Sequence, residues 1–350
     1  MSHRNRLQIH PDMSAPLELN PDVLEAICNA VDDRQTMCSL SLTCWSLREL
    51  AIKRLLGMQP LLVRGGRHLH ALHSFLIADE PRRFSHLRGL HLVRTKGERY
   101  TIERIARYLI DIFKHAAGLE YLELPNFNYF VGAGGDYLED DLPLREAIHQ
   151  LSSLRELVIT RMWPYRTTDE TFRSIRSPLK VVRIHRGDDG MRVEYPLGPM
   201  PIEFPAVRSV RFSFRTEPPW VDALVQMFPT LDRVLQVEKL KSGSYGASLK
   251  ADIASQRSVR AHNKKTQQTR AWKHIDFVTS DVHMLYMLGL TCTVRHLMVD
   301  RACAHQKERI ADILDDTRPV YLKLSIELWH GDDIFEDLFR SEATSRITHL

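Results

Sequence analysis

The segment Leu119-Glu120-Tyr121-Leu122-Glu123-Leu124 decides the fold, because its pattern recurs along most of the chain. The pattern is apolar-x-x-apolar-x-apolar. Clear copies begin at residues 87, 119, 154, 179, 207, 294 and 319, and weaker copies begin at Leu231 and Trp272. The second half of each copy alternates apolar and polar residues, which predicts a short strand with one buried face. Helical patterns separate the copies, and the stripe from Ile102 to Ala116 is the most complete.

Repeated strand–helix units predict an α/β fold whose strands stack in parallel. The steps between the first five clear copies vary from 25 residues (154 to 179) to 35 residues (119 to 154), whereas regular leucine-rich repeats have about 20–29 residues. We therefore predict that residues 57–350 form an irregular, leucine-rich-repeat-like α/β solenoid. An ordinary α/β domain with apolar buried strands is the alternative. Ile347-x-x-Leu350 begins one more copy.

Residues 15–56 carry a different pattern, which predicts three short helices. Asn20-Pro21 is typical of a helix start, because Asn caps well and Pro fits the first helical position. Apolar stripes follow on three successive segments, ending near Leu56. Such a small unit has little core of its own, so we expect it to need a partner or a neighbouring domain.

These residues resemble the F-box family. Its pattern runs roughly Leu-Pro-x-Glu-Ile-Leu-x-x-Ile, then a turn, then an apolar helix that ends near Cys-x-x-Trp. The chain has Leu19-Asn20-Pro21-Asp22-Val23-Leu24 and, after the turn, apolar residues at matching spacing. It departs from the pattern because its proline comes one place late and Leu47 stands at the usual tryptophan position. The run from Leu42 to Ala51 is similar to fungal members.

The resemblance implies a substrate-recognition subunit of an SCF-type E3 ubiquitin ligase. The F-box would dock on the Skp-type adaptor, and through it on a cullin–RING ligase, while the repeats bind an unknown protein substrate. The residues implied in the F-box core and adaptor contact are Leu19, Pro21, Val23, Leu24, Ile27, Val31, Leu40, Leu42, Cys44 and Leu47. The alternative is a non-ligase repeat scaffold for protein–protein interaction, with a helical N-terminal cap.

Basic residues stand between the apolar positions of the repeats. The candidate substrate-binding residues are Arg88, Arg155, Lys180, Arg183, Arg208 and Arg211. Their charge suggests an acidic or phosphorylated ligand. The alternative is that they are ordinary charged residues on exposed strand positions.

Composition narrows the kinds of partner and the cellular compartment that we expect. Lys plus Arg number 48 and Asp plus Glu number 44, so the formal net charge is +4, which makes nucleic acid an improbable main partner. The longest fairly apolar run, from Val282 to Val294, is too short to span a bilayer, so we expect no membrane contact. Five cysteines in no metal or redox spacing predict small buried side chains in a reducing compartment. We expect a cytoplasmic or nuclear protein.

Catalytic motifs are missing, so we predict a protein that is not an enzyme and has no catalytic residues, metal site or cofactor. His68, His70 and His73 are the best metal candidates. On a helix His70 and His73 share a face, but His68 does not join them, and no carboxylate or cysteine lies close by at ligand spacing. Two segments interrupt the repeats. Residues 126–141 predict a surface loop, and residues 241–273, rich in Ser, Gln, Lys and Arg, predict a polar insertion.

Overall fold

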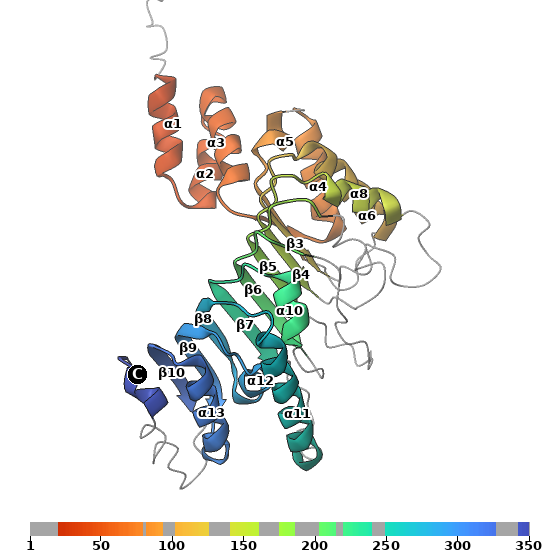
Figure 1. The fold of residues 1–350 in the computed structure, drawn as a ribbon. Helices are drawn as coiled ribbons and strands as arrows, with labels where there is room; N and C mark the ends of the chain where they lie inside the picture. Colours follow the sequence, from red (N-terminus) through yellow and green to blue (C-terminus); the bar gives the residue numbers. More distant parts are fainter. Residues whose placement is uncertain are drawn as a thin grey trace, which may run out of the picture. The chain divides into compact units, whose positions relative to one another are not determined.

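The computed structural model describes residues 20–79, 82–93, 102–125, 141–160, 175–185, 203–214, 220–239, 249–326 and 342–349. The chain divides into two compact units, Met1–Gln59 and Pro60–Leu350. Figure 1 shows helices alone in the first unit and a long sheet with helices in the second.

The described part of the first unit, residues 20–59, contains three helices, α1 (Pro21–Ala30), α2 (Arg34–Leu40) and α3 (Trp45–Gly57). The helix start predicted at Asn20-Pro21 is confirmed: Pro21 opens α1, and the Asn20 side chain accepts a hydrogen bond from the Asp22 backbone N–H at 2.9 Å. Asp33 caps α2 in the same way, accepting from the Thr36 N–H at 2.8 Å. Side-chain caps of this kind satisfy backbone donors that have no partner within the helix.

A small apolar core joins these helices, since α3 packs against both α1 and α2. The core is built on Cys28, Met37 and Ala51, and the side chains packed against it are Val31, Leu40, Leu47, Leu50 and Leu55. Lys53 Nζ lies 2.9 Å from Glu25 Oε1 and links α3 to α1 at the surface.

The second unit is built on a ten-stranded sheet in which every strand pairs in parallel with the next strand of the sequence. The strands are β1 (Leu61–Arg64), β2 (Gly89–Val93), β3 (Tyr121–Pro125), β4 (Glu156–Thr160), β5 (Val181–His185), β6 (Ser209–Phe214), β7 (Val234–Lys239), β8 (His274–Asp281), β9 (Thr293–Ala302) and β10 (Tyr321–Ile326). The α/β class and the parallel sheet are therefore confirmed.

The repeated motif sets the register of this sheet. The second apolar residue of every clear copy lies in one row that crosses the strands, beginning with Leu90, Leu122 and Leu157. The row continues through Val182, Val210, Leu235, Val278, Leu297 and Leu322. The starts predicted for the two weak copies, Leu231 and Trp272, are wrong. The row passes through Leu235 and Val278, so these copies begin one and three residues later than predicted.

Helices cover one face of the sheet (Figure 1). They are α4 (Gly65–Ile77), α5 (Arg82–His86), α6 (Ile102–His115), α8 (Asp141–His149), α10 (Val221–Met227), α11 (Leu249–Gln267), α12 (Val282–Leu288) and α13 (Lys307–Thr317), with short 3₁₀ turns η1 (Ala304–Gln306) and η3 (Glu342–Arg346). The predicted helix from Ile102 to Ala116 is confirmed by α6, where Ile105, Leu109 and Phe113 are buried. Alternate strand residues such as Leu122 and Leu124 are buried with these helices.

The predicted polar insertion is wrong for residues 249–267, which form α11 and pack against α10 and α12. Its polar residues are used inside the unit. Asn263, fully buried, accepts from the Val221 N–H at 3.1 Å and donates to Met287 O at 2.7 Å. Gln267 donates to Gly289 O at 2.8 Å and accepts from the Thr291 N–H at 3.0 Å. These contacts satisfy backbone groups near the ends of α10 and α12.

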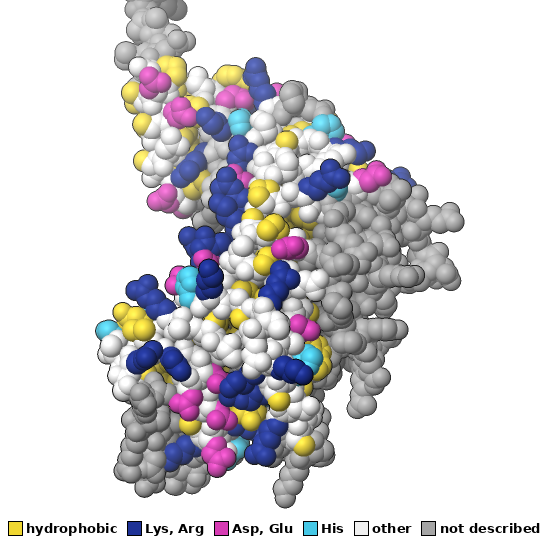
Figure 2. All heavy atoms as spheres, in the orientation of Figure 1, with side chains coloured by type: hydrophobic (Ala, Val, Ile, Leu, Met, Phe, Trp, Pro, Cys, Tyr) yellow, Lys and Arg dark blue, Asp and Glu magenta, His cyan; other side chains and the backbone are white. Residues whose placement is uncertain are grey.

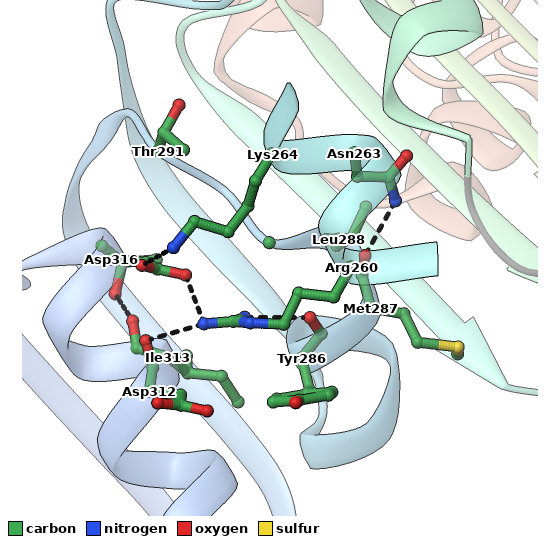
Figure 3. Close-up of polar contacts among 12 residues, drawn as sticks. Arg260, Asn263, Lys264, Tyr286, Met287, Leu288, Thr291, Asp312, Ile313 and Asp316 are labelled. Atoms are coloured by element: carbon green, nitrogen blue, oxygen red, sulfur yellow. Dashed lines mark hydrogen bonds and ion pairs between the residues drawn. The ribbon is translucent and has the colours of Figure 1, made fainter. Parts of the chain in front are cut away.

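An ion-pair cluster ties α11 to α13 (Figure 3). Arg260 donates to Tyr286 O at 3.0 Å and to Asp316 Oδ2 at 2.6 Å, and Lys264 donates to Asp316 Oδ1 at 2.7 Å. Gly289 lies beneath α11 with φ +51°, and a Cβ there would meet Lys264 Cγ at 3.0 Å. Glycine is needed at this position because it tolerates both the left-handed backbone and the close approach.

The last described segment continues the sheet. His349 forms a parallel bridge with Tyr321, and Leu322 N–H donates to His349 O at 3.0 Å. The final copy of the motif, which begins at Ile347, thus adds to the edge beyond β10. The predicted loop at 126–141 lies outside the described residues except for Asp141, which begins α8.

Candidate docking surfaces

Helix α1 has two apolar faces. Leu24 and Cys28 are 5% and 2% exposed and form its inner face. Val23 and Ile27 are 46% and 39% exposed, and the exposed Ala26 and Ala30 complete an i, i+3, i+4, i+7 set with them. This outer stripe has the spacing of an amphipathic helix that lays one face into a groove of a partner.

A second exposed apolar group lies where α2 joins α3. Leu42 is 86% exposed and Trp45, the first residue of α3, is 71% exposed. The Arg48 guanidinium carbon lies 5.7 Å from the centre of the Trp45 ring, within the range of a cation–π contact. Two large apolar side chains this exposed, three residues apart, are available to a partner.

The structure separates the ten residues implied by the F-box resemblance into distinct groups. Leu24 lies in the core of the unit, and Val31, Leu40 and Leu47 pack against that core. Residues exposed at the surface are Pro21, Val23, Ile27, Leu42 and Cys44. Leu19 lies outside the described residues. Ala26, Ala30 and Trp45 are surface residues that were not among the ten, although the helical spacing of the two alanines could have indicated them.

The face of the sheet opposite the described helices carries charged side chains in opposite-charge pairs. Arg183 Nη2 lies 2.7 Å from Glu156 Oε1 on the neighbouring strand, and Arg211 Nε lies 3.7 Å from Glu238 Oε1. The Tyr121 hydroxyl donates to Glu123 at 2.5 Å. Burial, together with that hydrogen bond, raises the pKa of Tyr121 above its usual range. The centre of this face is therefore close to electrically balanced.

The edge of the sheet formed by the carboxyl ends of the strands differs in charge from the amino-terminal edge, which is formed by the amino ends of the strands. At the carboxyl ends of β7–β9 lie Glu238, Asp281 and Asp300. Burial first, and then the nearby Asp281 and Glu238 carboxylates, raise the pKa of Asp300. Asp281 is engaged locally, because it caps α12 by accepting from the Met284 N–H at 2.9 Å.

Four of the six predicted substrate-binding residues lie at the amino-terminal edge, because Arg88, Arg155, Lys180 and Arg208 immediately precede β2, β4, β5 and β6. Arg183 and Arg211 lie instead on the paired face. Arg88 is a structural residue, because its Nη1 donates to Ser85 O at 2.8 Å and Gly118 O at 3.1 Å. Arg233, which precedes β7, belongs to the same edge and was missed because the weak copy at Leu231 was placed one residue early.

The histidines of α4 have separate roles. His73 Nε2 lies 2.5 Å from Asp111 Oδ2 on α6, His70 packs against Tyr108, and His68 contacts Arg64 O at 2.6 Å. In the part of the chain that the structure describes, no group of three or more His, Cys, Asp or Glu side chains could hold a metal ion.

The cysteines are all free, and Cys28, Cys292 and Cys303 are buried whereas Cys38 and Cys44 are exposed. The prediction of buried cysteines is therefore wrong for two of the five.

Among the described helices, none combines the length and hydrophobicity that a membrane span requires.

No protein-family model matches this chain. The comparison with curated proteins finds no significant match.

Proposed function

We propose that this chain is the substrate-recognition subunit of an SCF-type E3 ubiquitin ligase. The first unit would act as an F-box that docks on a Skp-type adaptor, and the second as a leucine-rich-repeat-like solenoid that binds a target protein. The exposed apolar stripe of α1, formed by Val23, Ala26, Ile27 and Ala30, carries the proposal. A helix that turns one apolar face to its own core and another to solvent is suited to a protein partner.

The size of the first unit supports the same conclusion. Its core centres on the buried side chains of Cys28, Met37 and Ala51, while Leu42 and Trp45 remain outside. Burying exposed apolar side chains against an adaptor would release about 25 cal/mol per Å² of buried surface. Docking would therefore stabilise both the complex and the unit itself.

The second unit supports the solenoid part of the proposal. Each strand pairs only with its sequence neighbours, and one motif position forms a continuous row across the sheet. Units that contact only their neighbours are the defining feature of solenoids, which present one long open face to partners. The protein would perform no bond chemistry. It would raise the effective concentration of target lysines near the ligase, in the cytoplasm or nucleus.

Co-purification with a Skp-type adaptor tests the proposal. We expect stoichiometric capture by the wild type and at least a tenfold loss with Val23→Asp/Ile27→Asp, because two carboxylates would be buried in an apolar contact. Both side chains are exposed in the free chain, so this variant should stay folded. A Leu24 substitution would be unsuitable, since Leu24 belongs to the core.

Asn29→Asp/Gln35→Asp is the matched control, because it adds the same charge at exposed positions away from the α1 stripe. It should retain capture. No capture by a well-folded wild type would overturn the proposal and favour a repeat scaffold whose N-terminal helices serve only as a cap.

A further inference from the structure

Four basic residues form a row along the amino-terminal edge of the sheet. Arg155, Lys180, Arg208 and Arg233 each directly precede a strand, from β4 to β7. Their backbones are hydrogen-bonded in sequence: Lys180 N–H donates to Arg155 O at 2.7 Å, Arg208 N–H to Lys180 O at 3.0 Å, and Arg233 N–H to Arg208 O at 2.9 Å. Neighbouring members therefore stand one strand spacing apart, about 4.8 Å. We call these four residues the basic row.

The fold only partly balances this row. Arg155 Nη1 lies 3.6 Å from Glu120 Oε2, and Arg208 pairs with Asp232. Among the ion pairs between described residues, none involves Lys180 or Arg233. All four side chains are exposed. Lys180 lies between two arginines on the neighbouring strands, and like charges directly opposite one another are unfavourable in a sheet.

The neighbouring face provides an internal comparison. Arg183 and Arg211 also occupy adjacent strands, but each has a carboxylate of a neighbouring strand beside it. Both arginines of the face thus have an acidic partner, whereas Lys180 and Arg233 of the basic row form no ion pair with a described residue. In Figure 2, Lys and Arg side chains gather at the left margin of the sheet, beside the strands labelled β5–β7 in Figure 1.

We propose that the basic row binds an acidic peptide segment of the target protein. This inference rests on the proposed function, because it names the chemistry of the target that the second unit would capture. The row covers three strand spacings, about 14 Å, which matches about four residues of extended chain. Cations spread over this length suit a run of several carboxylates better than a single phosphate group.

A nucleic acid fits this surface less well. The row is one residue wide, and the adjoining face carries Glu123 and Glu156, while Glu238, Asp281 and Asp300 lie at or near the opposite edge. A phosphate backbone is read by a broad basic field, and here it would meet these carboxylates. A single peptide strand lying along the edge avoids them.

Fluorescence anisotropy with labelled hexaglutamate tests the inference. We expect Lys180→Glu/Arg233→Glu to weaken binding at least tenfold. Both side chains are exposed and neither forms an ion pair with a described residue, so this variant should stay folded. Arg107→Glu/Lys114→Glu, at exposed positions of α6, makes the same charge change elsewhere and should bind within twofold of the wild type. Raising the salt concentration should weaken wild-type binding.

Three results would overturn the inference: equal loss in both variants, unchanged binding in Lys180→Glu/Arg233→Glu, or tighter binding of a single-stranded oligonucleotide of equal charge. Adaptor capture, measured on the same variants, separates the two proposals. Lost peptide binding with retained capture supports the basic row. Peptide binding by a wild type that captures no adaptor would refute the ligase proposal and leave the basic row standing.

Discussion

The buried amide of Asn263 offers the sharpest test of how α11 is held. Asn263→Leu keeps the side-chain size but removes the hydrogen bonds with the Val221 N–H and Met287 O. Both partners are backbone groups near helix ends, and Asn263 is fully buried. Each buried group left without a partner costs about 1–3 kcal/mol. We therefore expect the free energy of unfolding of the second unit to fall by about 3 kcal/mol.

Thermal unfolding followed by circular dichroism would measure this loss. For a unit of this size, about 3 kcal/mol corresponds to a Tm lower by roughly 6–12 °C. Lys265→Leu is the control, because it adds the same side chain at an exposed position of the same helix and should change Tm by no more than about 2 °C. If Asn263→Leu unfolds at the wild-type temperature, the amide does not hold α11 and the account of its polar residues is wrong.

Three further predictions concern core, charge and thiols. Leu24→Ala should destabilise the first unit by about 2–5 kcal/mol, whereas Ile27→Ala should cost under about 1 kcal/mol because Ile27 is already 39% exposed; urea unfolding of the two variants would distinguish them. The pKa of Asp300 is raised in the folded protein, so its ionised form is disfavoured there. The contribution of Asp300 to the free energy of unfolding is therefore fully present below the pKa that this residue has in the unfolded chain. It is lost as the pH rises through the pKa that Asp300 has in the folded protein. Asp300→Asn should therefore stabilise the protein at pH 7 and lose that advantage near pH 3.5, and an equal effect at both pH values in urea titrations would contradict the assignment. In the native protein, a thiol reagent should modify the two exposed cysteines quickly and the three buried ones slowly; burial raises the pKa of Cys292 to about 12, so rapid modification of all five would contradict the burial pattern.

The strands could be predicted from the sequence because their signal is local. The apolar-x-x-apolar-x-apolar motif alternates with the period of a strand, and only one register keeps all of its apolar residues on the helix-covered face. That is why copies such as the one at Leu119 align in the sheet. The weak copies failed where the motif lacks an apolar residue: Asp232 stands at the first position before β7, and Leu231 took its place in the prediction.

The roles of individual side chains were decided by the tertiary structure. Val23 and Leu24 are neighbouring apolar residues of α1, but packing leaves Val23 46% exposed and Leu24 5% exposed. The basic residues of the repeats look alike in sequence, but the pairing of strands brings Glu156 to Arg183 and brings no described acid to Lys180.

The amino-acid sequence by itself determined the α/β class, the positions of the clear strands and the start of the first helix, because hydrophobic period and caps act over a few residues. Only the tertiary structure decided that residues 249–267 form a packed helix. A polar side chain such as Asn263 or Gln267 is solvated unless neighbouring helices present unpaired backbone groups to it, and those groups lie 42 and 22 residues away in the sequence.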